Sequence, residues 1–421
     1  MMKTEYKQTK LGLIPEDWEV VKLGDVVKNL RSGVSVNTEN YPASLNEKGV
    51  LKTSAVFGGI LYPLENKAIT KVKELKRAKQ TLVGGELLIS RMNAPNLVGA
   101  CAYIHQSYDN LYLPDRLWMT ELNHDIVNSK HLNLLLNSGL YRYKLKMKAT
   151  GTSNSMKNIS KKSFLKIKIP LPPLPEQARI ADCLSQWDRG IALLERLIAQ
   201  KEEQKKGLMQ QLLTGRQRLP GFAGEWERVK LGDVFEEIKE INDGGDHEPL
   251  TISAKIGFVS QRSKFDRVIA GKSLSKYRLL TKGDFAYNKG NSKTYPMGCV
   301  YLLRKYDSAL VPFVYISFRA KVDADIDNMF YQHWFSNHGL DKQLKQIITS
   351  GARGDGLLNV NKGSFFSLKI PLPPLPEQKA IAAVLNTADR ELSLLGAKLG
   401  QYRLQKRGLM QQLLMGRKRL V

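Results

Sequence analysis

Two long segments of the chain repeat a seam of mostly apolar residues that lie alternately four and three positions apart. The first has this seam at Ile180, Leu184, Trp187, Ile191, Leu194, Ile198, Lys201, Lys205, Leu208 and Leu212. The second has it at Ile381, Leu385, Ala388, Leu392, Leu395, Leu399, Tyr402, Lys406, Leu409 and Leu413. A seam that recurs every 3.5 residues over several heptads predicts a coiled coil. Core packing of an ordinary long helix is the alternative, and the shared seam favours the coiled coil.

A proline-rich stretch precedes each periodic segment. Prolines at positions 170, 172, 173 and 175 exclude a helix interior, so this stretch is expected to be an extended connector. Pro175 and Pro376 suit the first turn of the following helices, where Glu176 and Glu377 are favourable beside the helix N-terminus. Glycines at positions 215 and 416 predict the helix ends.

The rest of the chain has shorter periodic runs. The runs 87–90, 298–303 and 164–169 predict strands, whereas 129–148 and 327–348 predict helices. This mixture predicts an α+β fold.

The chain contains an internal duplication. The run Trp18-Glu-Val-Val-Lys-Leu-Gly-Asp-Val26 returns at 226–234, an offset of 208. The run Ile169-Pro-Leu-Pro-Pro-Leu-Pro-Glu-Gln177 returns at 370–378, and the Gly-Leu-Met-Gln-Gln-Leu-Leu of 207–213 returns at 408–414, both offset by 201. The interior of the first copy is therefore seven residues longer, and its sequence diverges. The motifs that are similar in both copies indicate a function that the two copies share, and the diverged interiors indicate two different targets. Neutral drift of loops around an unchanged core is the alternative.

These patterns predict two globular domains joined by two long helices in an antiparallel coiled coil, with pseudo-two-fold symmetry. The expected boundaries are 1–170 and 220–371 for the domains, and 171–219 and 372–421 for the connectors and helices. If the ends of each domain are neighbours, the first helix leads away from domain one and the second returns to it. A helix of about 39 residues would be a spacer of about 58 Å.

Composition adds a strong basic charge to this picture. The chain has 65 Lys and Arg against 40 Asp and Glu, a formal net charge of +25, and residues 1–175 alone have +12. Such a charge favours nucleic acid or anionic lipid as partner. Lipid is the weaker choice because no run of about 18 apolar residues and no signal peptide is present, so a cytoplasmic protein without a membrane partner is expected. The three cysteines and six histidines have neither metal-site nor disulfide spacing.

Polar segments rich in Arg, Lys, Asn and Gly are the candidates for DNA contact, since these side chains reach base edges and phosphates. The candidates are Arg31, Arg91, Asn93, Arg116, Lys146, Thr150, Gly151, Thr152, Asn154, Lys157, Lys289, Asn291, Lys293, Tyr295, Gly351 and Arg353. For each of them a solvated loop side chain is the alternative.

The sequence does not favour catalysis by this chain. The run 270–273 resembles the end of a phosphate-binding loop, but Asp266 occupies the place of its first glycine. The glycines of 351–356 lack dinucleotide-binding spacing, and no Asn-Pro-Pro-aromatic or Asp-Pro-Pro-aromatic run occurs. We therefore expect no catalytic residue and no metal site. A self-contained DNA-modifying enzyme and a basic coiled-coil nucleic-acid-binding scaffold remain the alternatives.

Taken together, the duplicated tryptophan, proline-rich and helix-end motifs resemble the specificity subunits of type I restriction-modification systems, over essentially the whole chain. The resemblance implies two target recognition domains that each read half of a split, asymmetric site in double-stranded DNA. It implies that the helices set the spacing and bind two methyltransferase subunits, which methylate adenine, and that motor-nuclease subunits join the assembly. S-adenosylmethionine, Mg²⁺ and ATP would then belong to the partners. Ala388 in place of Trp187 is a departure that suggests different docking on the two sides.

Overall fold

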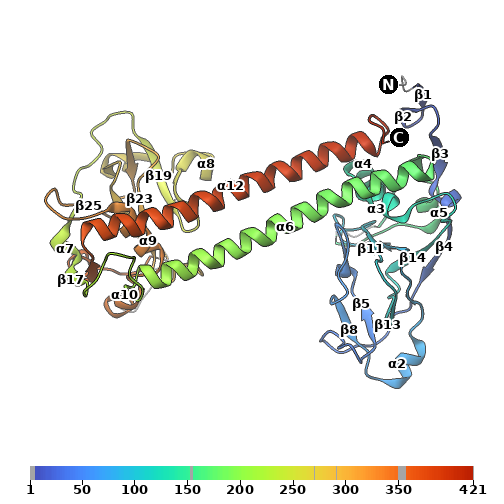
Figure 1. Ribbon diagram of the computed structural model, residues 1–421, viewed down its shortest axis with the longest axis horizontal. Coiled ribbons are helices and arrows are strands. Elements are labelled where there is room, and N and C mark those ends of the chain that lie inside the picture. Colours follow the sequence, from blue (N-terminus) through green and yellow to red (C-terminus); the bar gives the residue numbers. More distant parts are fainter. Residues whose placement is uncertain (1–4, 152–154, 270, 291, 349–356, 421) are drawn as a thin grey trace. The chain divides into compact units, whose positions relative to one another are not determined.

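The structure of the chain is a computed structural model that describes residues 5–151, 155–269, 271–290, 292–348 and 357–420. It divides into unit 1, Met1–Leu194 with Lys398–Val421, and unit 2, Glu195–Ala397. Two helices of 39 residues each, α6 (Leu174–Leu212) and α12 (Leu375–Leu413), contribute one part to each unit (Figure 1). Each unit thus consists of a globular part and two helix segments.

The main sheet of unit 1 has six strands. Their order is β4 (Val27–Ser32), β14 (Leu117–Leu122), β10 (Leu87–Ser90), β12 (Cys101–Tyr103), β7 (Gly59–Leu61) and β6 (Val56–Phe57). Strand β10 is buried on both faces: Leu87 and Ile89 belong to one core cluster and Leu88 to another. Successive side chains of a strand point to opposite faces, so this position explains why Leu87, Leu88 and Ile89 are all apolar.

The two faces of that sheet have different partners. One face packs against α3 (Ser129–Asn137) and α4 (Gly139–Met147), and this cluster extends to Ile180 and Leu184 of α6 and Leu413 of α12. The other face shares a core with a second sheet, ordered β8 (Asn66–Ala68), β5 (Gly49–Leu51), β13 (Tyr108–Tyr112) and β9 (Thr81–Leu82). The helix segments are thereby part of the domain core rather than an appendage.

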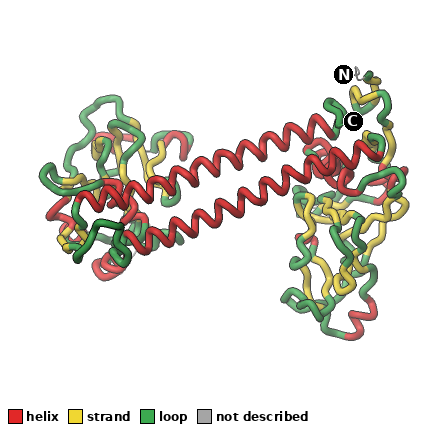
Figure 2. The backbone as a smooth tube through the Cα atoms, viewed as in Figure 1, coloured by secondary structure: helices red, strands yellow, loops and turns green. Residues whose placement is uncertain are grey.

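Unit 2 repeats this plan with different residues. Its main sheet is ordered β18 (Phe235–Glu237), β25 (Ile316–Ala320), β22 (Phe285–Asn288) and β23 (Cys299–Leu302). Its second sheet is ordered β20 (Gly257–Ser260), β19 (Glu248–Ser253), β24 (Ser308–Val311) and β21 (Arg278–Thr281). Aromatic rings fill the core, with Phe235 in edge contact with Phe285, Phe318 and Tyr331. Figure 2 shows the strands and helices of each globular part.

A two-stranded sheet closes each globular part at its ends. In unit 1, β3 (Glu19–Lys22) pairs with β16 (Lys168–Leu171), and in unit 2, β17 (Glu227–Lys230) pairs with β26 (Lys369–Leu372). The next residue of each motif also bonds across, since Leu23 N–H donates to the Ile167 carbonyl at 2.8 Å and Leu231 N–H to the Leu368 carbonyl at 2.7 Å. The beginning and the end of each diverged interior are therefore side by side.

The helix segments are antiparallel within each unit. In unit 1, Trp187 of α6 meets Tyr402 of α12 edge to face at 5.6 Å between ring centroids, and Asp188 pairs with Lys406. In unit 2, Lys205 of α6 pairs with Asp389 of α12 at 2.5 Å. Asp188 and Lys406 correspond to Asp389 and Lys205 at the offset of 201, so each unit contains the same ion pair.

The seam predicted from the sequence is confirmed. Every predicted seam residue of both helices is buried or half-buried, whereas Leu193, Leu394 and Leu404 beside the seam are exposed. The fold class, α+β with two long antiparallel helices and two equivalent globular parts, is also confirmed.

Three local predictions need correction. The segment 164–169 is not one strand, because α5 (Lys161–Leu165) ends in it and β16 begins at Lys168. Ser160 caps α5 by accepting from Ser163 N–H. Pro170 lies inside β16, which a two-stranded edge tolerates. The helix expected at 129–148 is broken into α3 and α4 at Ser138, and that at 327–348 into α9 (Asn328–Ser336) and α10 (Asp341–Ile347).

Candidate DNA-recognition interface

Five of the candidate residues in unit 1 come together where β10 ends. Strand β11 (Met92–Asn93) pairs with β15 (Lys157–Asn158), with Asn93 opposite Lys157. Thr150 forms a bridge with Asn158 on the other side of β15, and Lys157 donates from its ammonium group to the Gly151 carbonyl at 2.7 Å. Arg91 joins them by accepting from Ile159 N–H. We call Arg91, Asn93, Thr150, Gly151 and Lys157 the Arg91 cluster.

The guanidinium of Arg91 is positioned by a hydrogen bond at its Nε atom and by a contact with an aromatic ring. Its Nε donates to the Asp115 carbonyl at 2.9 Å, and the group lies 6.0 Å from the centroid of the buried Trp118 ring. Among the described residues, Asp115 is the only hydrogen-bond partner of this side chain, so its two terminal nitrogens stay available. A planar fork anchored at Nε is the geometry that binds two acceptors at once. Arg116 lies beside it, exposed, with its carbonyl accepting from Arg91 N–H.

Asn93 has a different role from the one its residue type suggests. Its Nδ2 donates to Ser90 Oγ at 3.1 Å, and its Oδ1 accepts from Ala94 N–H at 2.8 Å. Both ends of the amide are therefore used inside the turn. The geometry favours Asn93 as a residue that shapes the segment, and Arg91 as the one that can reach a ligand.

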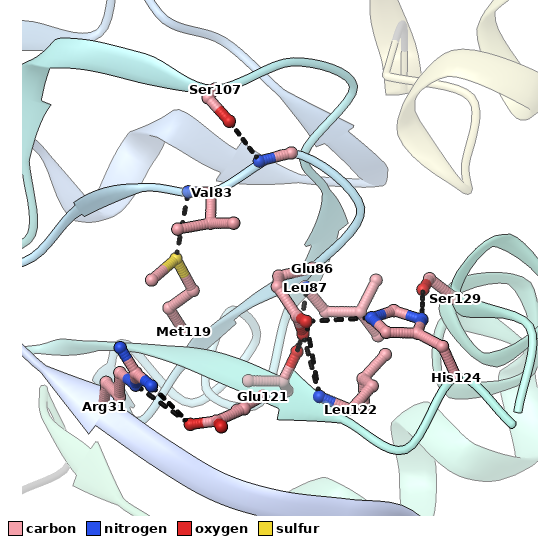
Figure 3. A network of polar contacts seen from close by, with 12 residues as sticks. Arg31, Val83, Glu86, Leu87, Ser107, Met119, Glu121, Leu122, His124 and Ser129 are labelled. Carbon is pink, nitrogen blue, oxygen red and sulfur yellow. Dashed lines mark hydrogen bonds and ion pairs between the residues drawn. The ribbon is translucent and has the colours of Figure 1, made fainter.

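Two further candidates lie outside the Arg91 cluster and have partners of their own. Arg31 on β4 forms an ion pair with Glu121 of β14 at 2.6 Å, and Figure 3 shows the two side chains facing each other. Lys146 on α4 donates to Asn96 Oδ1 at 3.4 Å. Arg31 is thus engaged within the sheet, and Lys146 lies next to the loop that follows the cluster.

The equivalent place in unit 2 has the same construction. Strand β22 ends at Asn288, Gly290 bridges to Leu357, and the Lys289 carbonyl accepts from Leu358 N–H at 2.9 Å. Lys289 therefore stands where Arg91 stands in unit 1, next to the segment that precedes the short helix α11 (Lys362–Phe366).

The other unit 2 candidates are placed as follows. Lys293 is exposed, while Tyr295 packs on His338 at 5.0 Å between ring centroids. Burial raises the pKa of the Tyr295 hydroxyl. The candidates Thr152, Asn154, Asn291, Gly351 and Arg353 lie outside the described residues.

A buried carboxylate connects strands of the main sheet of unit 1 at the beginning of β10, the end of that strand opposite to Arg91. Glu86 accepts from Thr120 Oγ1 at 2.8 Å and from Leu122 N–H at 3.1 Å, and it pairs with His124 at 3.0 Å (Figure 3). In unit 2, Asp284 occupies the corresponding turn, accepts from Thr281 N–H and pairs with Arg319 at 3.2 Å. Both acids connect strands, which gives them a structural role.

The duplicated motifs meet in one cluster per unit. The Trp18 cluster consists of Trp18, Glu176, Arg419 and Asp17: Trp18 Nε1 donates to Glu176 at 2.9 Å, and Arg419 bonds both Glu176 and Asp17. The hydrogen bond from Arg419 lowers the pKa of the Asp17 carboxyl.

The Trp226 cluster repeats this arrangement in unit 2. Trp226 Nε1 donates to Glu377 at 3.0 Å, and the Arg218 guanidinium bonds the same carboxylate at 2.5 Å. The glutamates are 3% and 0% exposed, so each buried charge depends on its arginine. Neither arginine is among the residues predicted from the sequence. The duplication continues past the helix ends as Gly-Arg-Gln-Arg-Leu219 and Gly-Arg-Lys-Arg-Leu420. This extension of the repeat is the sequence feature that could have identified the two arginines.

The glutamine of each proline-rich motif fastens a helix to its globular part. Gln177 accepts from Asn128 N–H at 2.8 Å and donates to the carbonyls of Ile126 and Pro172. Gln378 accepts from Asp327 N–H and donates to the carbonyls of Asp325 and Pro373 in the same way. The kept edges of the duplication are thus structural joints, and the diverged segments between them form the candidate interface.

Other features bear on the class of protein. Among the described residues, no group of three or more His, Cys, Asp or Glu side chains is placed to hold a metal ion. Within the same residues, no helix combines the length and apolar character needed to span a membrane. Cys101 and Cys299 are buried free thiols, with pKa values raised by burial to about 12 and about 11, and Cys183 is half-buried.

Comparison with known proteins agrees with this architecture. Residues 15–203 and 223–400 match the model of the type I restriction modification DNA specificity domain. The type I restriction enzyme MjaVIII specificity subunit of Methanocaldococcus jannaschii is 24% identical over 440 residues, which cover 97% of this chain and 94% of the relative. The EcoKI specificity subunit of Escherichia coli K12 is 22% identical over 400 residues, which cover 88% and 82%.

Solved structures show the same fold. The HsdS subunit from Thermoanaerobacter tengcongensis superposes with a TM-score of 0.53 at 20% identity, covering 96% of this chain and 98% of that one. The S subunit from M. genitalium gives a TM-score of 0.56 at 14% identity, covering 98% and 99%. Because the family model matches both copies of the duplication, the chain belongs to the type I restriction-modification specificity subunits, which recognise DNA sequence.

Proposed function

We propose that this chain reads a split, asymmetric site in double-stranded DNA, with one half read by each unit. The observation that supports this most is the equivalent placement of Arg91 and Lys289. Each follows the central strand of its sheet and lies against the segment before a short helix, yet the residues around them differ. Two equivalent places with different side chains suit two different half-sites.

We also propose that the chain is a non-catalytic subunit that directs adenine methyltransferase and restriction subunits to the site. S-adenosylmethionine, Mg²⁺ and ATP would be bound by those partners. The deciding experiment uses the purified chain with labelled S-adenosylmethionine and duplex DNA. Methyl transfer is expected only after a methyltransferase subunit is added, and transfer by the chain alone would overturn the proposal in favour of a self-contained enzyme.

A second experiment tests whether the chain recognises a particular DNA sequence. The full chain with its methyltransferase partner should retain duplexes selected from a random library more tightly than random 40-base-pair duplexes, with affinity falling steeply as salt rises. Equal affinity for both would favour a basic scaffold without sequence preference.

The exposed leucines of the helices support two docking sites for methyltransferase subunits. Leu193 in unit 1 is 62% exposed, and Leu394, its counterpart at the offset of 201, is 64% exposed. Each unit therefore offers one apolar side chain at an equivalent position. Native mass spectrometry of Leu193→Glu and Leu394→Glu should each show loss of one methyltransferase subunit. Ala199→Glu, at an exposed helix position, is the matched control; full assembly of both leucine variants would refute these docking positions.

A further inference from the structure

The second sheets of the two units have the same topology. In unit 1, β5 pairs antiparallel with β8 and parallel with β13, which pairs antiparallel with β9. In unit 2, β19 pairs antiparallel with β20 and parallel with β24, which pairs antiparallel with β21. One connection therefore joins the two edge strands of each second sheet, residues 69–80 in unit 1 and 261–277 in unit 2.

The connection in unit 1 presents a row of free lysines. It contains α2 (Val72–Arg77), and the ammonium-bearing side chains of Lys71, Lys73, Lys76 and Lys79 are all exposed. None of the four has an ion-pair partner among the described residues. Figure 1 places α2 at the end of unit 1 opposite to α3 and α5, away from strand β11.

The one acidic residue of this connection is turned inward. Glu74 is 5% exposed and accepts from Asn37 N–H at 3.1 Å, while Arg77 pairs with it at 2.8 Å. The hydrogen bond from the Asn37 backbone lowers the pKa of the Glu74 carboxyl. The surface of α2 consequently has four lysines without an ion-pair partner among the described residues, although the charge of Lys73 contributes to the lowered pKa of Glu74.

The connection in unit 2 has a different sequence and the same charge. It contains α8 (Gln261–Phe265) and a 3₁₀ segment, η2 (Gly271–Lys276), and Arg262, Lys264, Arg267 and Lys276 are exposed. Each of the two connections has five basic residues and one acidic residue, a net +4. No ion pair between the four exposed basic residues and a described acid is present.

We propose that these two connections are phosphate-binding surfaces that hold each recognition unit on the DNA backbone without reading bases. The inference rests on the proposed function and adds a site outside the Arg91 cluster. The same net charge recurs at the same topological position in both units, although the sequence between the two edge strands differs. A requirement for charge, but not for side-chain identity or geometry, is the property of phosphate contact.

The residue types support phosphates over base edges. Three of the four exposed residues in unit 1 lie on or directly before the short helix α2, and all four are lysines, whose flexible ammonium groups act as point charges. Arg91, in contrast, is fixed by Asp115 and Trp118 in the manner that base reading requires. Each unit would then have one site that contacts bases and a separate site that binds backbone phosphates.

The test uses the full chain assembled with its methyltransferase subunit. The fourfold variant Lys71→Gln, Lys73→Gln, Lys76→Gln, Lys79→Gln is compared with wild type on library-selected and on random 40-base-pair duplexes over a salt series. Both duplexes should bind more weakly by the same factor, and the slope of log K against log salt should be shallower by about three to four, near one unit per lysine. The methylated sequence should stay unchanged.

The matched control removes the same charge elsewhere in unit 1, through Lys10→Gln, Lys22→Gln, Lys28→Gln and Lys168→Gln, all exposed positions. Its slope should stay near that of wild type. An unchanged slope in the α2 variant, an equal change in the control, or an altered methylated sequence would each overturn the phosphate-binding role. Wild-type protein that does not prefer the selected duplex would instead refute the proposed function. Arg262→Gln, Lys264→Gln, Arg267→Gln and Lys276→Gln repeat the test in unit 2.

Discussion

Neither ring nitrogen of His131 has a hydrogen-bond partner among the described residues, although the side chain is only 1% exposed. Burial lowers the pKa of this imidazole to about 4. Its counterpart three residues after the helix cap in unit 2 is Phe330, which packs on Trp226 at 6.0 Å between ring centroids. An apolar ring thus suits the position, and the histidine is a cost to folding.

We predict that His131→Phe and His131→Leu stabilise the chain, by about 1–3 kcal/mol at neutral pH. Between pH 6.5 and about 4 the unfolded histidine takes up a proton that the folded one does not, so wild-type stability falls as pH falls through this window. Urea unfolding at several pH values should show a loss of up to roughly 3 kcal/mol in wild type. The two His131 variants should lack this loss and exposed His105→Ala should retain it; an equal slope in all four proteins would contradict the prediction.

Arg91 is the residue for which geometry and proposed role agree best. Arg91→Lys keeps the charge but loses the planar fork, so discrimination at one base pair should fall by about 1–3 kcal/mol while binding to random duplexes changes little. Sequencing of methylated sites would show one relaxed position in one half-site. Arg31→Lys is the control, because Glu121 occupies that guanidinium. Relaxation in both half-sites would exclude a single-base contact by Arg91.

At the scale of elements, the Trp18 cluster and the Trp226 cluster explain why the edges of the duplication persist. Each unites one residue from the tryptophan motif, one from the proline-rich motif and one from beyond a helix end. A change in any of the three leaves a buried carboxylate or indole without its partner.

Arg419→Ala should therefore lower the free energy of unfolding by about 3–5 kcal/mol, since it leaves the Glu176 charge buried and unpaired. Arg417→Ala, at an exposed position two residues away, should cost less than about 0.5 kcal/mol. Chemical denaturation monitored by tryptophan fluorescence would measure both. Glu176→Gln combined with Arg419→Ala should recover part of the loss, and a double variant as unstable as the sum of the singles would argue against coupling.

The elements differ in how far the sequence predicts them. The long helices follow from a seam that recurs within one segment, and their antiparallel pairing from the duplication. The strand expected at 164–169 failed because Ser160 caps a short helix whose apolar residues also fit an alternating pattern. The Trp18 cluster could not be derived, because its partners lie 158 and 243 residues apart. The residues of the Arg91 cluster were predicted from their residue types alone. The different roles of Arg91 and Asn93 follow only from the structure, in which β11 pairs with β15 and the Asn93 amide donates to Ser90.

At the scale of the whole molecule, α6 and α12 each pass from one unit into the other. If these helices set the separation of the half-sites, inserting seven residues after Leu194 and seven after Ala397 keeps the seam in register. Each insertion adds about 10.5 Å of helix, close to three base pairs of duplex. Sequencing of methylated sites should reveal a spacer longer by about three base pairs.

Insertions of four residues at the same two places are the control, because they displace the seam and should impair assembly instead. A spacer that stays the same length after the seven-residue insertions would remove the helices as the source of half-site separation.

The pairing of β3 with β16, and of β17 with β26, has a consequence for inheritance. Each diverged interior begins and ends on two adjacent, paired strands. This pairing fixes the positions of the two ends of the interior but does not fix the number of residues between them. The seven-residue difference between the copies is absorbed in this way. We expect that exchange of the gene segment between the paired strands, with one crossover at each end, gives a host a new half-site while the helices and the two tryptophan clusters are inherited unaltered.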